Sequence, residues 1–341
     1  MRGRMSSLKD RVLGLLKSYK GSWIPQSHIH RALGVSKSRV SEILAELEKE
    51  GLIARRVVGR SKIVYVYPDV GEREVEAVGR LIRVGLVYSS EYLFMSAFAK
   101  GLEASGYRVE VRVFNDGIKA TRALAEGLVD IAVSPLVGQL YLYPTYRTYR
   151  IILAGLWGGF RVLSLGEPGP VYSSAISTMD YARRVAVARG GLEADETRYY
   201  WSSDEALKII KPGEGYVVTW HPIYLKLVEE GARVVYEPEE LDVKFCCTLG
   251  VSTAVSNRAK GAIARAYLNA LEAYAREPER GLEYYSSLTG INISTLKSAT
   301  REYKVAEGLD IKLVRGILRE YAPTIPAHSV YEEAVEAEML E

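Results

Sequence analysis

Apolar positions near the start of the chain recur at helical spacing and then give way to strand-like runs. Leucine and valine return every three to four residues, which is the spacing of one buried helix face. Three segments show this spacing, and the third begins after Ser36, a capping residue, and stops at Gly51. The predicted elements are helices at Ser7–Tyr19, at Pro25–Leu33 and between Ser36 and Gly51, then strands at Leu52–Val58 and Lys62–Tyr67.

The pattern changes after a charged connector at Gly71–Arg80. Short β-rich runs then alternate with amphipathic segments, which is typical of an α/β fold with a parallel sheet and right-handed crossovers. The first run predicts strands at Ile82–Tyr88, Arg108–Phe114, Asp130–Ser134 and Arg150–Gly155, and helices at Tyr92–Ala104, Ile118–Glu126 and Leu136–Tyr146. The second run predicts strands at Phe160–Leu165, Arg198–Trp201, Tyr216–Thr219, Arg233–Tyr236 and Thr248–Ser256, helices at Gly169–Gly190, Asp204–Ile210 and Pro222–Glu230, and a helical remainder.

The turn Gly34-Val35-Ser36 is of the kind that joins the two helices of a DNA-reading unit. With the patterns GVSKSxV and LxxLExEGLI and a Gly-Arg ribbon tip, it makes residues 1–70 resemble the winged helix-turn-helix family, MarR-like in type. The resemblance implies binding of double-stranded DNA, with the third helix at base edges and the ribbon at phosphates. The residues expected there are Lys37, Ser38, Arg39 and Ser41 in the helix, and Arg55, Arg56, Arg60 and Lys62 in the ribbon.

The charge of the chain is concentrated in this part. Residues 1–70 carry 14 Lys and Arg against 6 Asp and Glu, a net charge of +8. The other residues carry 31 against 36, a net charge of −5, although the whole chain is only +3. A basic segment of this kind favours a polyanion as partner. The alternative is a winged helix that contacts proteins through an ordinary solvated basic face.

The second part resembles the type II periplasmic binding fold, in the branch that includes sulfonate, nitrate and pyrimidine-precursor binders. The phrases that carry the likeness are IRVGLVYSSEY, ALAEGLVDIAVSP and SSDEALKIIKPGEGYVVTWHPIYLKLVEEGARVV. Gly215-Tyr216 departs from the pattern, because many relatives have an aspartate before this strand. The resemblance implies a two-lobed domain at 81–341, with the first lobe at 81–159 and 245–341 and the second at 160–244, joined through a linker at 71–80 to the domain at 1–70.

In such folds ligands lie between the lobes, at the carboxyl ends of the strands. Hydroxyls near helix N-termini favour an anionic group, and tyrosine and tryptophan rings favour a flat or apolar part of the ligand. The candidate ligand-binding residues are Tyr88, Ser89, Ser90, Glu91, Tyr92, Asn115, Ser134, Tyr172, Ser173, Ser174, Trp220 and His221. The ordinary alternatives are that the serines cap helices and that the tyrosines pack in the interior.

Other kinds of site find little support in the sequence. Cys246 and Cys247 are the only cysteines and are adjacent, which argues against a disulfide framework or a thiolate metal site. The segment GLWGG at Gly155–Gly159 lacks the spacing of a nucleotide-phosphate loop, and no cofactor is expected. His221 with Glu91 or Asp116 opposite it is the one partial candidate for acid–base catalysis.

These observations predict a one-component transcriptional regulator that acts as a homodimer and whose DNA affinity depends on a small-molecule effector. The long linker helix of LysR-type regulators is absent, so their assembly is not carried over. The alternatives are an enzyme of cofactor or pyrimidine biosynthesis with an accessory DNA-binding head, and a solute-capturing protein of a transporter. No apolar run is long enough for a membrane span and MRGRMSSLKDR lacks an apolar core, so a cytoplasmic protein is expected. Scarce Gln and Asn are typical of a thermophile.

Overall fold

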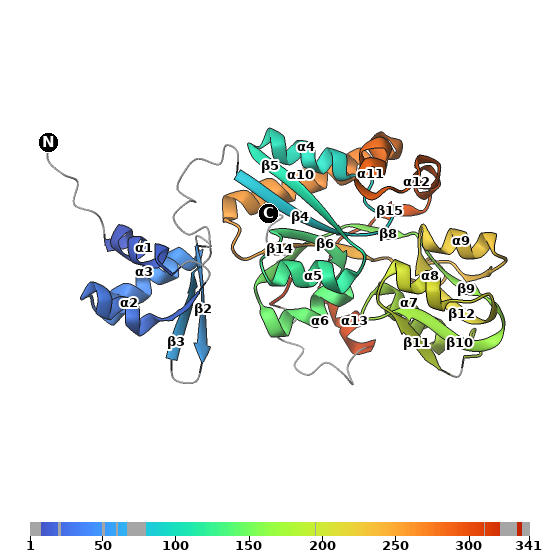
Figure 1. The fold of residues 1–341 in the computed structure, drawn as a ribbon, viewed down its shortest axis with the longest axis horizontal. Helices are drawn as coiled ribbons and strands as arrows, with labels where there is room; N and C mark the ends of the chain where they lie inside the picture. Colours follow the sequence, from blue (N-terminus) through green and yellow to red (C-terminus); the bar gives the residue numbers. More distant parts are fainter. Residues whose placement is uncertain are drawn as a thin grey trace. The chain divides into compact units, whose positions relative to one another are not determined.

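The computed structural model describes residues 8–19, 22–49, 52–58, 61–66, 80–194, 196–309, 311–320 and 333–335. Residue contacts divide the chain into two units (Figure 1). One unit is Met1–Arg80 with Thr253–Gly261, and the other is Leu81–Ser252 with Ala262–Glu341. Arg60 and the connector up to residue 79 lie outside the described residues, and the domain boundaries stay a prediction.

The described residues between positions 8 and 66 form the helices α1 to α3 and a three-stranded antiparallel sheet in the order β1-β3-β2. The predicted helices and strands are confirmed to within a few residues, and β1 is an additional short strand that the pattern did not predict. The fully buried side chains of Leu16, Val40 and Leu44 lie where the helices meet. The elements are α1 (Leu8–Lys17), β1 (Trp23–Pro25), α2 (Gln26–Leu33), α3 (Lys37–Lys49), β2 (Ile53–Val58) and β3 (Ser61–Val66).

A glycine turn joins α2 to α3. Gly34 has a φ of 65°, a left-handed conformation that favours glycine, and its N–H donates to the carbonyl of Arg31. The N–H of Val35 donates to the carbonyl of His30, which closes the end of α2. The side chain of Ser36 then accepts from the N–H of Arg39 at 3.4 Å, so the residue predicted as a cap lies directly before α3 and caps its first turn.

The larger unit holds two five-stranded sheets. The first has the order β5-β4-β6-β14-β7, in which β4 runs parallel to β6, and β14 runs antiparallel to β6 and β7. The second has the order β11-β10-β12-β9-β13, in which β10 is parallel to both of its neighbours. The strands of the first sheet are β4 (Arg80–Val87), β5 (Tyr107–Phe114), β6 (Ile131–Pro135), β7 (Tyr149–Ala154) and β14 (Cys247–Ser252). Those of the second are β9 (Phe160–Ser164), β10 (Gly166–Ser174), β11 (Thr197–Tyr200), β12 (Gly213–Trp220) and β13 (Arg233–Tyr236).

Helices cover both sheets, and a small third sheet pairs β8 with β15 (Figure 1). One hydrophobic core continues from the first sheet into the second, with Leu136, Val162 and Val218 among its fully buried members. The remaining elements are α4 (Met95–Ala104), α5 (Gly117–Ala125), α6 (Leu136–Tyr146), β8 (Leu156–Gly158), α7 (Thr178–Ala188), α8 (Ser203–Ile209), α9 (Ile223–Glu229), α10 (Asn257–Arg276), the 3-10 turn η1 (Pro278–Gly281), α11 (Leu282–Thr289), α12 (Ile293–Ala299), β15 (Tyr303–Val305) and α13 (Ile311–Glu320). Among the described residues, no helix has the length and apolarity that crossing a membrane requires.

The predicted helix at Gly169–Gly190 is wrong in its first half. Val171, Tyr172 and Ser173 pair with strands on both sides, so this segment is the central strand β10 and not a helix. Helix α7 begins only at Thr178, after the side chain of Ser177 accepts from two backbone N–H groups. The C-terminal remainder, predicted to be helical throughout, also contains the short strand β15.

Candidate functional site

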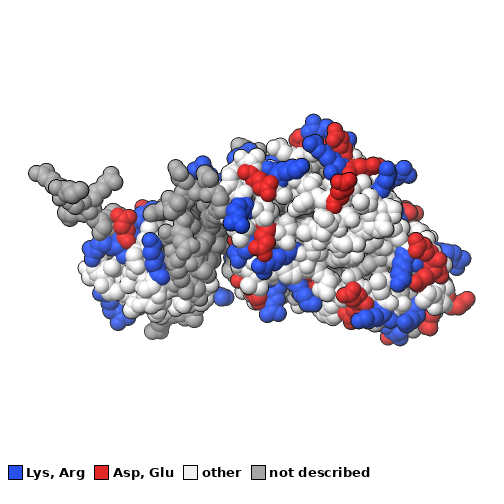
Figure 2. Space-filling view, turned by 45° about the horizontal axis from the view of Figure 1, so that its top comes forward, with Lys and Arg blue, Asp and Glu red and all other residues white. Residues whose placement is uncertain are grey.

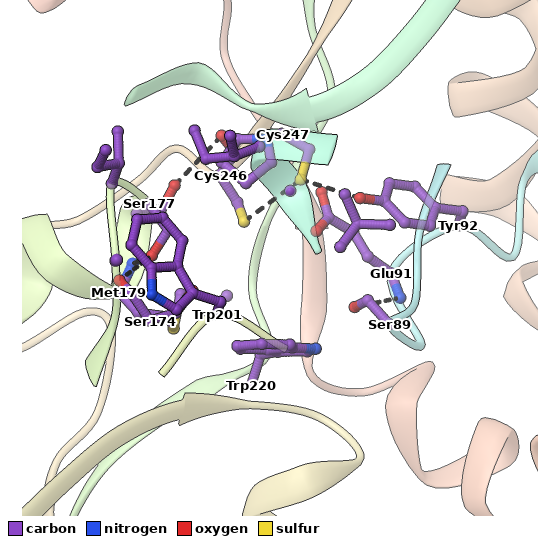
Figure 3. Close-up of a pocket in the computed structure, with 18 of the residues that line it drawn as sticks. Ser89, Glu91, Tyr92, Ser174, Ser177, Met179, Trp201, Trp220, Cys246 and Cys247 are labelled. Carbon is purple, nitrogen blue, oxygen red and sulfur yellow. Dashed lines mark hydrogen bonds between the residues drawn. The ribbon is translucent and has the colours of Figure 1, made fainter. Parts of the chain in front are cut away.

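A cavity of about 40 Å³ lies between the two sheets of the larger unit (Figure 3). Its walls are mostly apolar or aromatic and come from the ends of strands in both sheets, with a few polar groups among them. The lining residues are Val87, Ser89, Glu91, Tyr92, Gly117, Ile118, Pro135, Gly158, Ser174, Ala175, Ile176, Ser177, Thr178, Met179, Trp201, Trp220, Cys246, Cys247 and Tyr303. A single water needs about 10–15 Å³, so the space suits a small group.

The loop between β4 and α4 forms the first wall. The hydroxyl of Ser89 accepts from the N–H of Glu91 at 3.1 Å and lies 3.2 Å from the hydroxyl of Tyr303. The hydroxyl of Tyr285 donates to the carbonyl of Ser89 at 2.7 Å. These bonds hold the loop in one conformation and place Glu91 in the wall, where its side chain is 3% exposed.

Glu91 is a buried carboxyl group beside two thiols. Burial raises its pKa to about 7, although the thiols of Cys247 and Cys246 have the opposite effect. Its Oε1 atom has no hydrogen-bond partner among the described residues. Tyr92 donates from its hydroxyl to the sulfur of Cys247 at 3.0 Å, and burial raises the pKa of that thiol well above its ordinary value. A carboxyl with this pKa changes its charge near neutral pH.

The end of β10 and the start of α7 form the opposite wall, across the cavity from Glu91 (Figure 3). Ser177 accepts from the N–H groups of Met179 and Asp180 and donates to the carbonyl of Ser174 at 2.8 Å. Between them, Ile176 has a φ of 49°, which is unusual for a β-branched residue and is typical of functional loops. Trp201 completes this wall and is 47% exposed.

Five of the predicted ligand-binding residues line the cavity: Ser89, Glu91, Tyr92, Ser174 and Trp220. Trp220 also links the two sheets, because its Nε1 donates to the carbonyl of Tyr88 at 3.0 Å. The loop at the end of β4 and the loop at the end of β12 are thereby held together beside the cavity.

The other seven predicted residues lie outside the lining. Asn115 is exposed, and the hydroxyl of Ser134 is engaged by Thr121 and Gln139 in the interior. Tyr172 packs in the core of the second sheet. Tyr88 contributes only its carbonyl group to the Trp220 contact, Ser90 and Ser173 are fully buried with unpartnered hydroxyls among the described residues, and His221 is fully buried as well.

Neither His221 nor Asp116 lines the cavity, so the acid–base candidate of His221 with Glu91 or Asp116 opposite it does not lie there. His221 Nε2 lies 3.0 Å from the hydroxyl of Ser298, and burial together with Arg161 lowers its pKa to about 4. The imidazole is therefore neutral at neutral pH. The carboxylate of Asp116 caps α5, accepting from the N–H of Ile118 at 2.7 Å.

The prediction missed the cysteine pair, Trp201, Tyr303 and the Ser177 turn. Cys247 pairs with Pro135 at the carboxyl end of β6, because β14 runs antiparallel and brings its amino end to that edge. The rule that ligands lie at carboxyl ends of strands does not select such a residue. The Ser177-Thr178 sequence is itself a helix-start signal, but the helix predicted at Gly169–Gly190 begins before it and therefore does not single out Ser177.

Two glycines of the GLWGG segment allow Tyr303 to reach the cavity. Strand β15 pairs with β8, placing Tyr303 opposite Gly158. At Gly159 a Cβ atom would overlap the Tyr303 ring, and φ is +61°. The segment therefore permits close packing around the cavity, a purpose for which glycine has no substitute.

The smaller unit carries the candidate DNA-facing residues. Lys37, Ser38, Arg39, Arg56 and Lys62 are exposed and Ser41 is half-buried. Arg55 is held inside the unit: its Nε and its N–H each donate to the Glu48 carboxylate at 2.8 Å. Figure 2 shows Lys and Arg side chains, together with some acidic ones, on the visible face of this unit, and basic and acidic side chains are also mixed over that of the larger unit.

Comparison with protein families gives a match to the first part of the chain. Residues 5–67 match a family described as a domain of unknown function, DUF7343. No curated protein matches the chain.

Several solved structures are similar to this one over most of its length. One is a ligand-binding component of an ABC-type import system from Staphylococcus aureus, with zinc bound. It is 12% identical to this chain with a TM-score of 0.64, and the matched region covers 76% of this chain and 97% of the other. The alkanesulfonate-binding protein SsuA from Xanthomonas axonopodis pv. citri, bound to MOPS, is 13% identical with a TM-score of 0.63, covering 77% and 100%. The nitrate-binding protein NrtA from Synechocystis PCC 6803 is 13% identical with a TM-score of 0.63, covering 76% and 87%. At such identities the likeness shows the fold, and it confirms the predicted two-lobed α/β architecture of periplasmic-binding type.

Proposed function

We propose that this protein is a transcriptional regulator whose affinity for DNA depends on a small molecule bound between the two sheets. The observation that carries the ligand-binding part is the cavity itself, which is lined by strand ends of both sheets and contains two tryptophans and a few convergent polar groups. A mostly apolar cavity with a few placed polar groups is typical of a small-molecule site. The similar structures that bind sulfonates or nitrate support the same proposal.

The DNA-binding part rests on the smaller unit. Its tight glycine turn precedes α3, whose first turn exposes Lys37, Ser38 and Arg39. The net charge of +8 in residues 1–70 adds attraction to a polyanion. A helix with exposed basic and hydroxyl side chains in its first turns suits the major groove, and the ribbon residues Arg56 and Lys62 suit phosphates.

Coupling between the two parts requires that the ligand bind more tightly to one DNA-binding state than to the other. A difference of about 1–3 kcal/mol would change operator affinity by roughly 5- to 150-fold. We propose that a ligand in the cavity alters the arrangement of the two sheets and that this change is transmitted to the DNA-binding units of a dimer. A ligand with equal affinity for both states would have no effect on DNA binding.

A ligand screen on the full chain tests the first part of the proposal. Alkanesulfonates, MOPS, nitrate and aromatic carboxylates are scored by thermal shift, and a hundredfold excess over Kd should stabilise by about 2.7 kcal/mol. Any ligand found is then titrated against Trp201→Ala, and Trp23→Ala is the matched control because it replaces an equally exposed tryptophan outside the cavity. We expect the first substitution to weaken binding about tenfold and the second to leave it unchanged. Equal effects would contradict the cavity as the site.

The same ligand is then added to a DNA-binding titration. Genomic DNA fragments enriched by the full chain provide the operator, and the affinity is measured with and without ligand at fixed salt. A change of at least fivefold in DNA affinity on adding the ligand supports the proposal that the protein is a ligand-responsive regulator. Unchanged affinity, with the ligand bound, would contradict it.

An enzyme is the second candidate, and Glu91 is the observation that favours it. A carboxyl group with a pKa of about 7 in a cavity is suited to proton transfer at neutral pH. If the protein is an enzyme, we expect a ligand found in the screen to be converted during overnight incubation, which mass spectrometry would detect. If it is a regulator without catalytic activity, we expect the ligand to be recovered unchanged.

A further inference from the structure

Three side chains with metal-binding atoms meet in the wall of the cavity. Glu91 comes from the loop after β4. Cys247 is the first residue of β14 and Cys246 precedes it, more than 150 residues later in the chain. The carboxylate oxygen and the two sulfur atoms all lie within 4.8 Å of one another. All three side chains are buried, and all three line the cavity (Figure 3).

The separation of the two sulfur atoms matches that of two ligands on one tetrahedral ion. Cys246 Sγ and Cys247 Sγ lie 3.7 Å apart. Two thiolates that each bind at about 2.3 Å with tetrahedral angles would be roughly 3.8 Å apart. An ion can therefore be bound by both sulfurs without a change in their spacing.

The backbone holds both cysteines in place. The carbonyl of Cys246 accepts from the N–H of Leu136 at 3.0 Å, and the carbonyl of Cys247 accepts from the N–H of Gly155 at 3.1 Å. Cys247 also pairs with Pro135 in the first sheet. A site built on strands and paired carbonyl groups needs little reorganisation when an ion binds.

The third donor is a buried polar atom without a partner. Oε1 of Glu91 makes no hydrogen bond to any described residue, although the side chain is only 3% exposed. Buried polar atoms are nearly always satisfied, so this oxygen is free to bind a further group such as an ion. The hydroxyl of Tyr92 donates to Cys247 Sγ at 3.0 Å, which is the type of contact that orients a metal ligand from outside.

We propose that Glu91, Cys246 and Cys247 bind one thiophilic divalent ion of the zinc class, with a fourth position that faces the cavity. Sulfur donors select zinc-like ions over Mg²⁺ and Ca²⁺, which require oxygen ligands. Each thiol that binds releases its proton to solvent, because the thiolate is the ligand. The described lining residues include no Lys or Arg, so the ion itself supplies the positive charge that three buried anionic groups require. Three protein ligands and one open position would let an anionic ligand in the cavity complete the coordination.

Cobalt absorption tests this site directly. The full chain is stripped with a chelator, kept reduced without added thiols, and titrated with Co²⁺. We expect one Co²⁺ per chain, the visible bands of a tetrahedral ion, a thiolate-to-cobalt charge-transfer band, and displacement of the cobalt by Zn²⁺. Because the chain has no other cysteine, a thiolate band can come only from this pair.

Variants distinguish the three ligands. Cys246→Ser and Cys247→Ser should each lower the charge-transfer intensity by about half, and the double variant should abolish it. Glu91→Gln should retain the band but weaken affinity about 10- to 100-fold, whereas Glu103→Gln, an exposed carboxylate on α4, should have no effect. Circular dichroism verifies that each variant is folded.

Two results would overturn the proposal. One is a folded, reduced wild-type chain that binds no Co²⁺ or binds it without a thiolate band. The other is one ion per two chains, which would place the ion between copies. The measurement contains no DNA and no organic ligand, so its failure and the failure of the proposed function are separate outcomes.

Discussion

Arg39 and Arg55 belong to the same unit, but their surroundings leave only Arg39 free to contact DNA bases. Arg39 lies in the first turns of α3 and forms an ion pair with Glu42 at 2.7 Å, and both side chains are exposed. An exposed pair of this kind contributes at most about 1 kcal/mol, so the guanidinium can leave it for a base. Arg55 is half-buried and donates to Glu48 from both its side chain and its backbone. Its guanidinium therefore supports the ribbon in this structure.

We expect Arg39→Ala to lower the preference for the operator over unrelated DNA by about 1–3 kcal/mol, because bidentate contact with a guanine edge would be lost. Lys62→Ala is the comparison: it should weaken binding to all sequences and lower the salt slope by about 1. Both are measured by anisotropy titrations at several salt concentrations. An unaltered preference in the first variant would remove Arg39 from the base-reading surface.

His221 makes stability depend on acidity. Its pKa is lowered to about 4 in the folded chain, against about 6.5 when unfolded, so the unfolded state binds more protons between these values. The free energy of unfolding should therefore fall as the pH is lowered through this range, by about 2 kcal/mol between pH 7 and pH 5. His221→Gln should remove that part of the dependence, as measured by denaturant unfolding at both values. Parallel pH profiles for the two proteins would contradict the assignment.

At the scale of elements, the contact between β8 and β15 shapes the floor of the cavity. Tyr303 lies over Gly159 and reaches the hydroxyl of Ser89, which also holds the Glu91 loop. The close approach depends on the absence of a side chain at position 159. One small residue therefore determines where a loop of the first sheet and a short C-terminal strand meet.

We expect Gly159→Ala to destabilise the larger unit by about 3 kcal/mol or more, because it combines an unfavourable positive φ with overlap of the Tyr303 ring. Gly127→Ala is the matched control: its φ is +75° and nothing lies within 4 Å of the added atom. That variant should lose only about 1–2 kcal/mol. Denaturant midpoints measure both, and equal losses would show that packing against Tyr303 is unimportant.

At the scale of the whole molecule, one chain combines a small unit rich in basic residues with a larger α/β unit of periplasmic-binding fold. A single winged helix offers few base contacts, and two-fold proteins match palindromic half-sites. We expect two chains on each operator, with half-sites about one or more helical turns apart. Sedimentation of the protein–DNA complex measures the stoichiometry. A specific complex with one chain would contradict the proposed homodimer.

Most elements were predictable because their signals are local. Helix α6 and the α2–Gly34–α3 turn match the predictions closely, since apolar spacing, caps and glycines act within a few residues. Strand β10 was not predictable in this way. Its strand conformation depends on pairing with β11 and β12, whose sequences lie later in the chain.

The sequence by itself determined the segregation of positive charge, the order of most helices and strands, and loops that hold five of the cavity residues. Only the tertiary structure decided which of those loops converge. It placed His221 and Ser134 in the interior, outside the cavity lining, and it brought Cys246 and Cys247 beside Glu91. The physical reason is that an antiparallel strand places its amino end at the carboxyl end of its neighbour, and no pattern along the chain records that pairing.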